Sequence, residues 1–141
     1  MIQRIQTAYL VLGALALLAL LLIDPIWSGA AAQSQAWFAP TVLILGGLAA
    51  LVALIAIFLY KDRKRQHKVI ILAQGLTVLH LLALYLGLYL SNSLYVRTSS
   101  GIDVVMLIAL VLPLAAYILF LLARRGVKKD IDLVKSMDRL R

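Results

Sequence analysis

Four long runs of apolar residues, separated by short polar segments, dominate the chain. They predict four helices, over about residues 6–24, 38–60, 69–90 and 104–124. At 1.5 Å per residue, a helix of about 20 residues is roughly 30 Å long, which matches the hydrocarbon layer of a membrane. We therefore expect an all-α fold, in which residues 1–126 form an integral membrane bundle of four antiparallel helices.

The segment 127–141 has a different pattern. Its apolar side chains recur at positions 127, 131, 134 and 137, which is helical spacing, with charged residues between them. Gly126 precedes it, and glycine commonly ends a helix. We predict a short cytoplasmic amphipathic helix, which can lie on the membrane surface or dock against residues 61–68 or a partner protein.

The composition excludes a soluble domain. Of the 141 residues, 64% are hydrophobic and 14% are charged, and a soluble body of this size has too much surface to hide such an excess. One alternative concerns the first run, because Ala30-Ala31-Ala32 after it resembles a signal-peptidase site. The run is long for a signal peptide and only Arg4 precedes it, so we interpret it as a retained span.

Basic residues predict the orientation. Of the 14 lysines and arginines, 13 lie at the N-terminus, in the loop 61–68 or after the fourth run, and Arg97 is the exception. By the positive-inside rule, both termini and the loop 61–68 are cytoplasmic, and the segments 24–37 and 91–103 face outward. This placement accounts for the net charge of +8. It favours contact of the basic loop with anionic lipid headgroups over nucleic-acid binding.

Small residues predict where the helices touch. Helices in lipid associate by close packing, so glycine and alanine stripes are informative. The candidate packing residues are Gly46, Ala50, Ala53 and Gly87, together with Pro113, which is expected to kink the fourth span. The same faces can bind the helices of another subunit, so a homo-oligomer or a membrane-protein partner stays open.

The spans carry little that could do chemistry. Their cores contain no Asp, Glu, Lys or Arg, the groups typical of proton relays and ion-coupled transporters. Gln74, Thr77 and His80 are the candidate polar residues within the membrane, and a lone histidine most often bonds a neighbouring helix. Cysteine is absent, and no catalytic, phosphate-binding or metal-binding motif occurs. We therefore expect no enzymatic activity, no cofactor and no metal site.

Both ends of the chain resemble an uncharacterised family. The opening Met1-Ile2-Gln3-Arg4-Ile5-Gln6-Thr7 with Tyr9-Leu10, and the ending with Lys129-Asp130, Leu133-Val134, Ser136 and Asp138-Arg139-Leu140-Arg141, resemble a four-helix inner-membrane family of Bacteroidota, domain of unknown function 4293. The resemblance implies a location in the bacterial inner membrane and brings no activity, substrate or cofactor. Ile131 stands where the closing pattern of that family has Glu.

The predicted topology places both of these ends on the cytoplasmic side, which indicates a role in assembly. The candidate docking residues are Arg4, Lys129, Asp130, Ser136, Asp138, Arg139 and Arg141. We expect a non-catalytic inner-membrane protein that serves as an accessory or assembly subunit, with a cytoplasmic tail that contacts a partner. The alternatives are a small transporter or channel that uses Gln74, Thr77 and His80 with the kink at Pro113, and a lipid-binding module that uses the loop 61–68.

Overall fold

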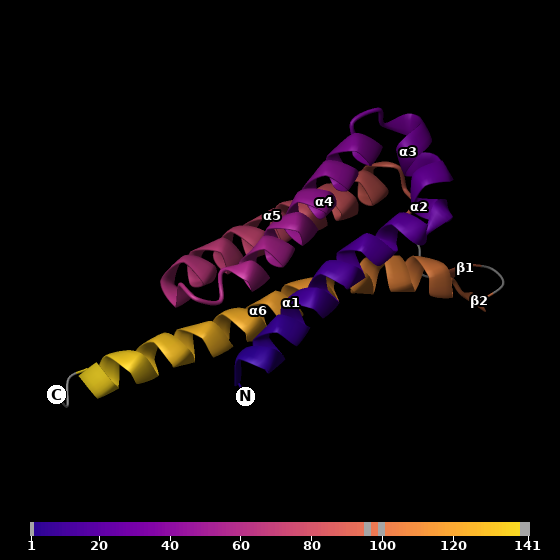
Figure 1. Ribbon diagram of the computed structural model, residues 1–141. Coiled ribbons are helices and arrows are strands. Elements are labelled where there is room, and N and C mark those ends of the chain that lie inside the picture. Colours follow the sequence, from indigo (N-terminus) through magenta and orange to yellow (C-terminus); the bar gives the residue numbers. More distant parts are fainter. Residues whose placement is uncertain (1, 95–96, 99–100, 139–141) are drawn as a thin grey trace.

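The computed structural model describes residues 2–94, 97–98 and 101–138, and helices account for most of it (Figure 1). The four long helices are α1 (Ile2–Ala19), α4 (Phe38–Phe58), α5 (Arg63–Leu90) and α6 (Val104–Asp138). The 3-10 helix η1 (Leu20–Leu22) follows α1, and the short helices α2 (Asp24–Ser28) and α3 (Ala30–Ser34) lead to α4. Strands β1 (Arg97–Thr98) and β2 (Gly101–Ile102) pair antiparallel between α5 and α6.

The long helices pack as a bundle in which each contacts two neighbours. Helix α1 lies against α4 and α6, and α5 lies against the same two helices. The N- and C-terminal ends lie at one end of the bundle, and α2, α3 and the strand pair lie at the other (Figure 1). Within the described residues, four helices are long and apolar enough to cross a membrane. The predicted antiparallel four-helix architecture is confirmed, and it is that of a multi-pass membrane protein.

Small residues face inward and large ones face outward. Alanines such as Ala53, Ala73 and Ala116 have no exposed surface, whereas Ile44 and Leu82 are each 60% exposed. In lipid this distribution is favourable, because outward side chains meet acyl chains and small inward side chains let helix backbones approach. The core also holds some large side chains, among them Leu10, Ile70, Leu84 and Phe120.

Helix α5 begins within the segment expected to be the loop 61–68. The carboxylate of Asp62 accepts a hydrogen bond from the backbone N–H of Arg65, at 3.1 Å, and so caps the first turn. Gln66 donates to the carbonyl of Ala56, at 3.1 Å, which ties this turn to the end of α4. With 28 residues, α5 is about 42 Å long, so its polar start extends beyond a hydrocarbon layer of about 30 Å.

Helix α6 corrects the prediction of a separate C-terminal amphipathic helix. It runs without a break through 35 residues, from the membrane span into the tail. Gly126 lies inside the helix and lacks the positive φ of a glycine cap, which among the described glycines only Gly101 has. A Cβ at Gly126 would lie 3.0 Å from Cγ of Gln6. The glycine therefore allows α1 to approach closely, and packing against α1 stabilises α6 beyond Gly126.

Candidate functional site

The predicted polar residues of α5 all face the interior of the bundle. Gln74 is 5% exposed, Thr77 0% and His80 1%. The three side chains hydrogen-bond to three different helices, α5 itself, α6 and α4. The hydroxyl of Thr77 donates to the carbonyl of Ala73 on its own helix, at 2.8 Å, and the amide oxygen of Gln74 accepts from Arg124 of α6, at 3.2 Å. The structure therefore brings these residues onto one face without joining them into one cluster.

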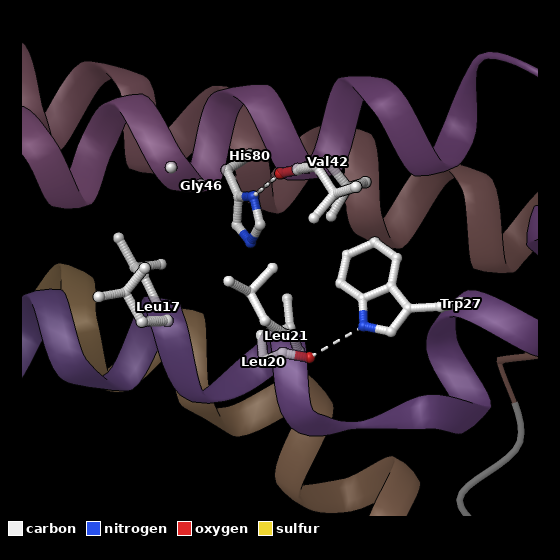
Figure 2. A pocket seen from close by; sticks show the side chains of 10 residues that line it. Leu17, Leu20, Leu21, Trp27, Val42, Gly46 and His80 are labelled. Carbon is white, nitrogen blue, oxygen red and sulfur yellow. Dashed lines mark hydrogen bonds between the residues drawn. The ribbon is translucent and has the colours of Figure 1, made fainter.

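His80 connects α5 to α4. Its Nδ1 lies 3.0 Å from the carbonyl oxygen of Val42, and because a carbonyl only accepts, Nδ1 carries the proton. Gly46 makes this possible, since a Cβ there would lie 2.9 Å from Cε1 of the imidazole. The ring nitrogen Nε2 has no partner among the described residues. It points toward Leu20 and Leu21, across a cavity of about 10 Å³ (Figure 2), which is room for about one water molecule.

The candidate packing residues are all buried, and two of them receive a large ring. Gly46 receives the imidazole of His80, and Gly87 receives the phenyl ring of Phe38. Ala50 is 2% exposed and Ala53 0%. In the described structure these residues lie at contacts between helices of the same chain.

Pro113 lies buried inside α6. A proline within a helix cannot donate to the carbonyl four residues earlier, and its ring disturbs the preceding turn. The hydroxyl of Tyr85 donates to the carbonyl of Leu110 in that turn, at 2.8 Å. Tyr85 thus ties α5 to α6 beside the proline.

A buried hydrogen bond joins the start of α1 to the tail of α6. The side-chain amide of Gln6 on α1 donates to Oδ2 of Asp130 on α6, at 2.8 Å. Gln6 is 4% exposed and Asp130 is 5% exposed. Gly126 lies one turn before Asp130, and the side chain of Gln6 packs against it. The glycine and the aspartate therefore form the site in which the Gln6 side chain lies.

The other docking candidates have different surroundings. Lys129 and Ser136 are exposed, and the hydroxyl of Ser136 donates to the carbonyl of Leu133, at 2.8 Å. Arg139 and Arg141 lie outside the described residues, as do the side chains of Arg4 and Asp138. Of the predicted docking residues whose side chains the structure describes, Asp130 is the one that hydrogen-bonds to another helix.

The polar start of α5 lies beside the tail part of α6. His67 lies in the polar start of α5, just before the apolar part of the helix, which begins at Val69. Partial burial of His67, followed by the positive charges of Arg124 and Lys128, lowers its pKa below the ordinary value, with Asp132 acting in the opposite direction. The two segments also border an open groove of about 640 Å³, lined by Lys61, Asp62, Arg63, Lys64, Ile131, Val134 and Lys135.

The comparisons with known proteins identify a family. Residues 2–140 match the family model described as domain of unknown function DUF4293. The chain belongs to the DUF4293 family. No curated protein and no solved structure matches it. Within the described residues of this DUF4293 protein, no group of three or more His, Cys, Asp or Glu side chains could hold a metal ion.

Sequence reasoning did not single out Gln6, Phe38 or Tyr85 in this DUF4293 chain. Gln6 belongs to the opening that carries the family resemblance, which is the one signal that could have found it. No sequence signal marks Phe38 or Tyr85. In the sequence they look like the other aromatic residues of the chain, and only their contacts in the folded structure distinguish them. Their roles depend on how the helices cross, which the order of residues along one helix does not encode.

Proposed function

We propose that the protein is a non-catalytic subunit of the bacterial inner membrane, which assists or assembles a partner through its cytoplasmic tail. The observation that carries this proposal is the continuous helix α6. Its 35 residues make it about 52 Å long, roughly 20 Å more than the hydrocarbon layer requires. The excess is a stiff arm whose first turns pack against α1 and whose end projects past it, on the side of both termini (Figure 1).

One face of this arm suits contact with a protein. Lys129, Leu133 and Ser136 follow one another at intervals of four and three residues, so they share a helix face, which we call the exposed tail face. Leu133 is 50% exposed. Asp130 and Val127 lie on another side and are buried in the bundle. A large apolar residue between two polar ones, beyond the hydrocarbon layer, is favourable once a partner covers it.

A photocrosslinking amino acid at position 133 tests the proposal. We expect one discrete protein adduct in native membranes when Leu133 is replaced by benzoylphenylalanine. The same replacement at Ile118, which is 54% exposed in the middle of α6, is expected to give lipid adducts, because that position faces the acyl chains. The proposal would be overturned if position 133 also gave lipid adducts alone and the purified protein were a solitary monomer in mild detergent.

The proposed orientation has its own test. With 13 of the 14 basic residues at the end that holds both termini and the loop 61–68, that end is expected to stay in the cytoplasm. The chain contains no cysteine, so single cysteines report their side without background. A membrane-impermeant maleimide should label Ser34→Cys in intact spheroplasts, and Ser136→Cys only after the membrane is opened. The reverse pattern would show the opposite orientation.

A small transporter or channel is the second candidate. The unpartnered Nε2 of His80, which is 1% exposed, is the observation in its favour. Transport needs a path wide enough for its substrate, whereas the cavity beside this nitrogen measures about 10 Å³. Thr77 and the amide oxygen of Gln74 have hydrogen-bond partners within the bundle, and Nε2 of Gln74 has none among the described residues. We therefore favour the accessory role.

A further inference from the structure

Beyond the proposed subunit role, the groove between the start of α5 and the tail part of α6 has the features of a ligand site. It is open and measures about 640 Å³. Four cationic side chains line it, Lys61, Arg63 and Lys64 from the α5 side and Lys135 from α6. In the part of the chain that the structure describes, none of these side chains has a hydrogen-bond or ion-pair partner.

The single carboxylate in the groove is already engaged. Asp62 caps α5 through the N–H of Arg65 and pairs with the guanidinium of Arg65, whose Nε lies 3.0 Å from Oδ2. Arg65 itself does not line the groove. The groove is therefore lined by four cationic side chains and one carboxylate, which is already paired with Arg65. This excess of positive charge favours the binding of an anion.

The position of the groove relative to the membrane favours a lipid as its ligand. At 1.5 Å per residue, Lys64 lies about 8 Å before the apolar part of α5 begins at Val69, and the headgroup region extends roughly 5–8 Å beyond the hydrocarbon layer. The α6 wall adds two apolar side chains, the half-buried Ile131 and Val134, which is 40% exposed. A free phosphate ion would gain nothing from them, whereas a phospholipid has apolar parts beside its phosphate.

We propose that this groove binds the headgroup of an anionic phospholipid. The phosphate lies among Lys61, Arg63, Lys64 and Lys135, and the glycerol backbone lies along Ile131 and Val134. Bound there, one lipid bridges the cytoplasmic start of α5 and the tail of α6. Because the lipid site uses the side of α6 that carries Ile131 and Val134, it leaves the exposed tail face open for a partner.

The test is native mass spectrometry of the delipidated full-length protein, with phosphatidylglycerol and phosphatidylcholine of identical acyl chains as probes. We expect the wild type to retain phosphatidylglycerol in preference. The triple variant Lys61→Ala, Lys64→Ala, Lys135→Ala should bind it at least about tenfold more weakly, since each basic residue contributes up to roughly a factor of five near a membrane surface.

The matched control removes three charges outside the groove, with Lys68→Ala, Arg125→Ala and Lys129→Ala. All three positions are exposed cationic residues at the same end of the bundle, and none lines the groove. We expect this control to bind phosphatidylglycerol as the wild type does. Equal loss in the two triple variants would overturn the proposal, because it would show a diffuse attraction to negative charge.

Two further arms distinguish the lipid from a free anion. Inorganic phosphate in large excess should leave the phosphatidylglycerol adduct in place, and Val134→Ser should weaken that adduct several-fold without any change of charge. If phosphate displaced the lipid completely and Val134→Ser bound as the wild type, the groove would be a site for soluble anions, and the lipid assignment would be wrong. Equal binding of phosphatidylcholine by the wild type would also overturn it.

Discussion

Gly87→Ala is expected to lower the free energy of unfolding of the bundle by about 1–3 kcal/mol, the usual cost of inserting a group into a filled core. A Cβ at Gly87 would lie 2.5 Å from Cε2 of Phe38 and closer still to Cδ2. Phe38 has no exposed surface, so its ring has nowhere to move without displacing its neighbours. Unfolding by SDS in mixed micelles, followed by circular dichroism, measures the loss.

Gly75 supplies the matched control on the same helix. A Cβ there meets no atom within 4 Å, so Gly75→Ala is expected to leave stability unchanged or raise it by up to about 1 kcal/mol through helix propensity. The cost of Gly87→Ala should also shrink when Phe38→Ala is present, because the two changes remove and refill the same space. Equal effects of the two alanine substitutions would contradict the proposed packing.

This contact shows what the apolar pattern encodes and what it leaves open. The lengths of the apolar runs predict the four spans, because the thickness of the membrane sets how many apolar residues each helix needs. The same pattern indicated that Gly46 and Gly87 lie at helix contacts. It did not indicate that His80 fills the space beside the first and Phe38 the space beside the second, because the crossing of two helices decides which side chain meets which gap.

The tail of α6 shows a failure with a physical cause. Gly126 after a basic pair indicated the end of a helix, and helix propensity alone supports that interpretation. The structure instead places Gly126 against Gln6 of α1, 120 residues earlier in the chain. A contact over such a separation outweighs a local preference of about 1 kcal/mol. In the same region Asp130, a candidate docking residue, is buried and pairs with Gln6 of α1.

The buried pair of Gln6 and Asp130 leads to the second large effect. Asp130→Ala is expected to leave the amide N–H of Gln6 without an acceptor in a site where Gln6 is 4% exposed. An unsatisfied buried donor costs about 1–3 kcal/mol, and the loss falls on the contact between the start of α1 and the tail of α6. Hydrogen–deuterium exchange of the backbone amides in residues 127–138 should therefore become about 10–100-fold faster, at 1.4 kcal/mol per factor of ten.

Two comparisons separate this local effect from a general change of charge. Asp130→Asn keeps a carbonyl oxygen that can accept from Gln6, so its exchange should stay close to that of the wild type. Asp132→Ala removes an exposed carboxylate two residues further along the same helix and should also leave the exchange unchanged. If Asp130→Asn loosened the tail as much as Asp130→Ala, the negative charge and not the hydrogen bond would hold the arm. If only Asp130→Ala loosens it, the crosslink at position 133 should weaken in that variant as well, because a frayed arm no longer presents the exposed tail face in a fixed position.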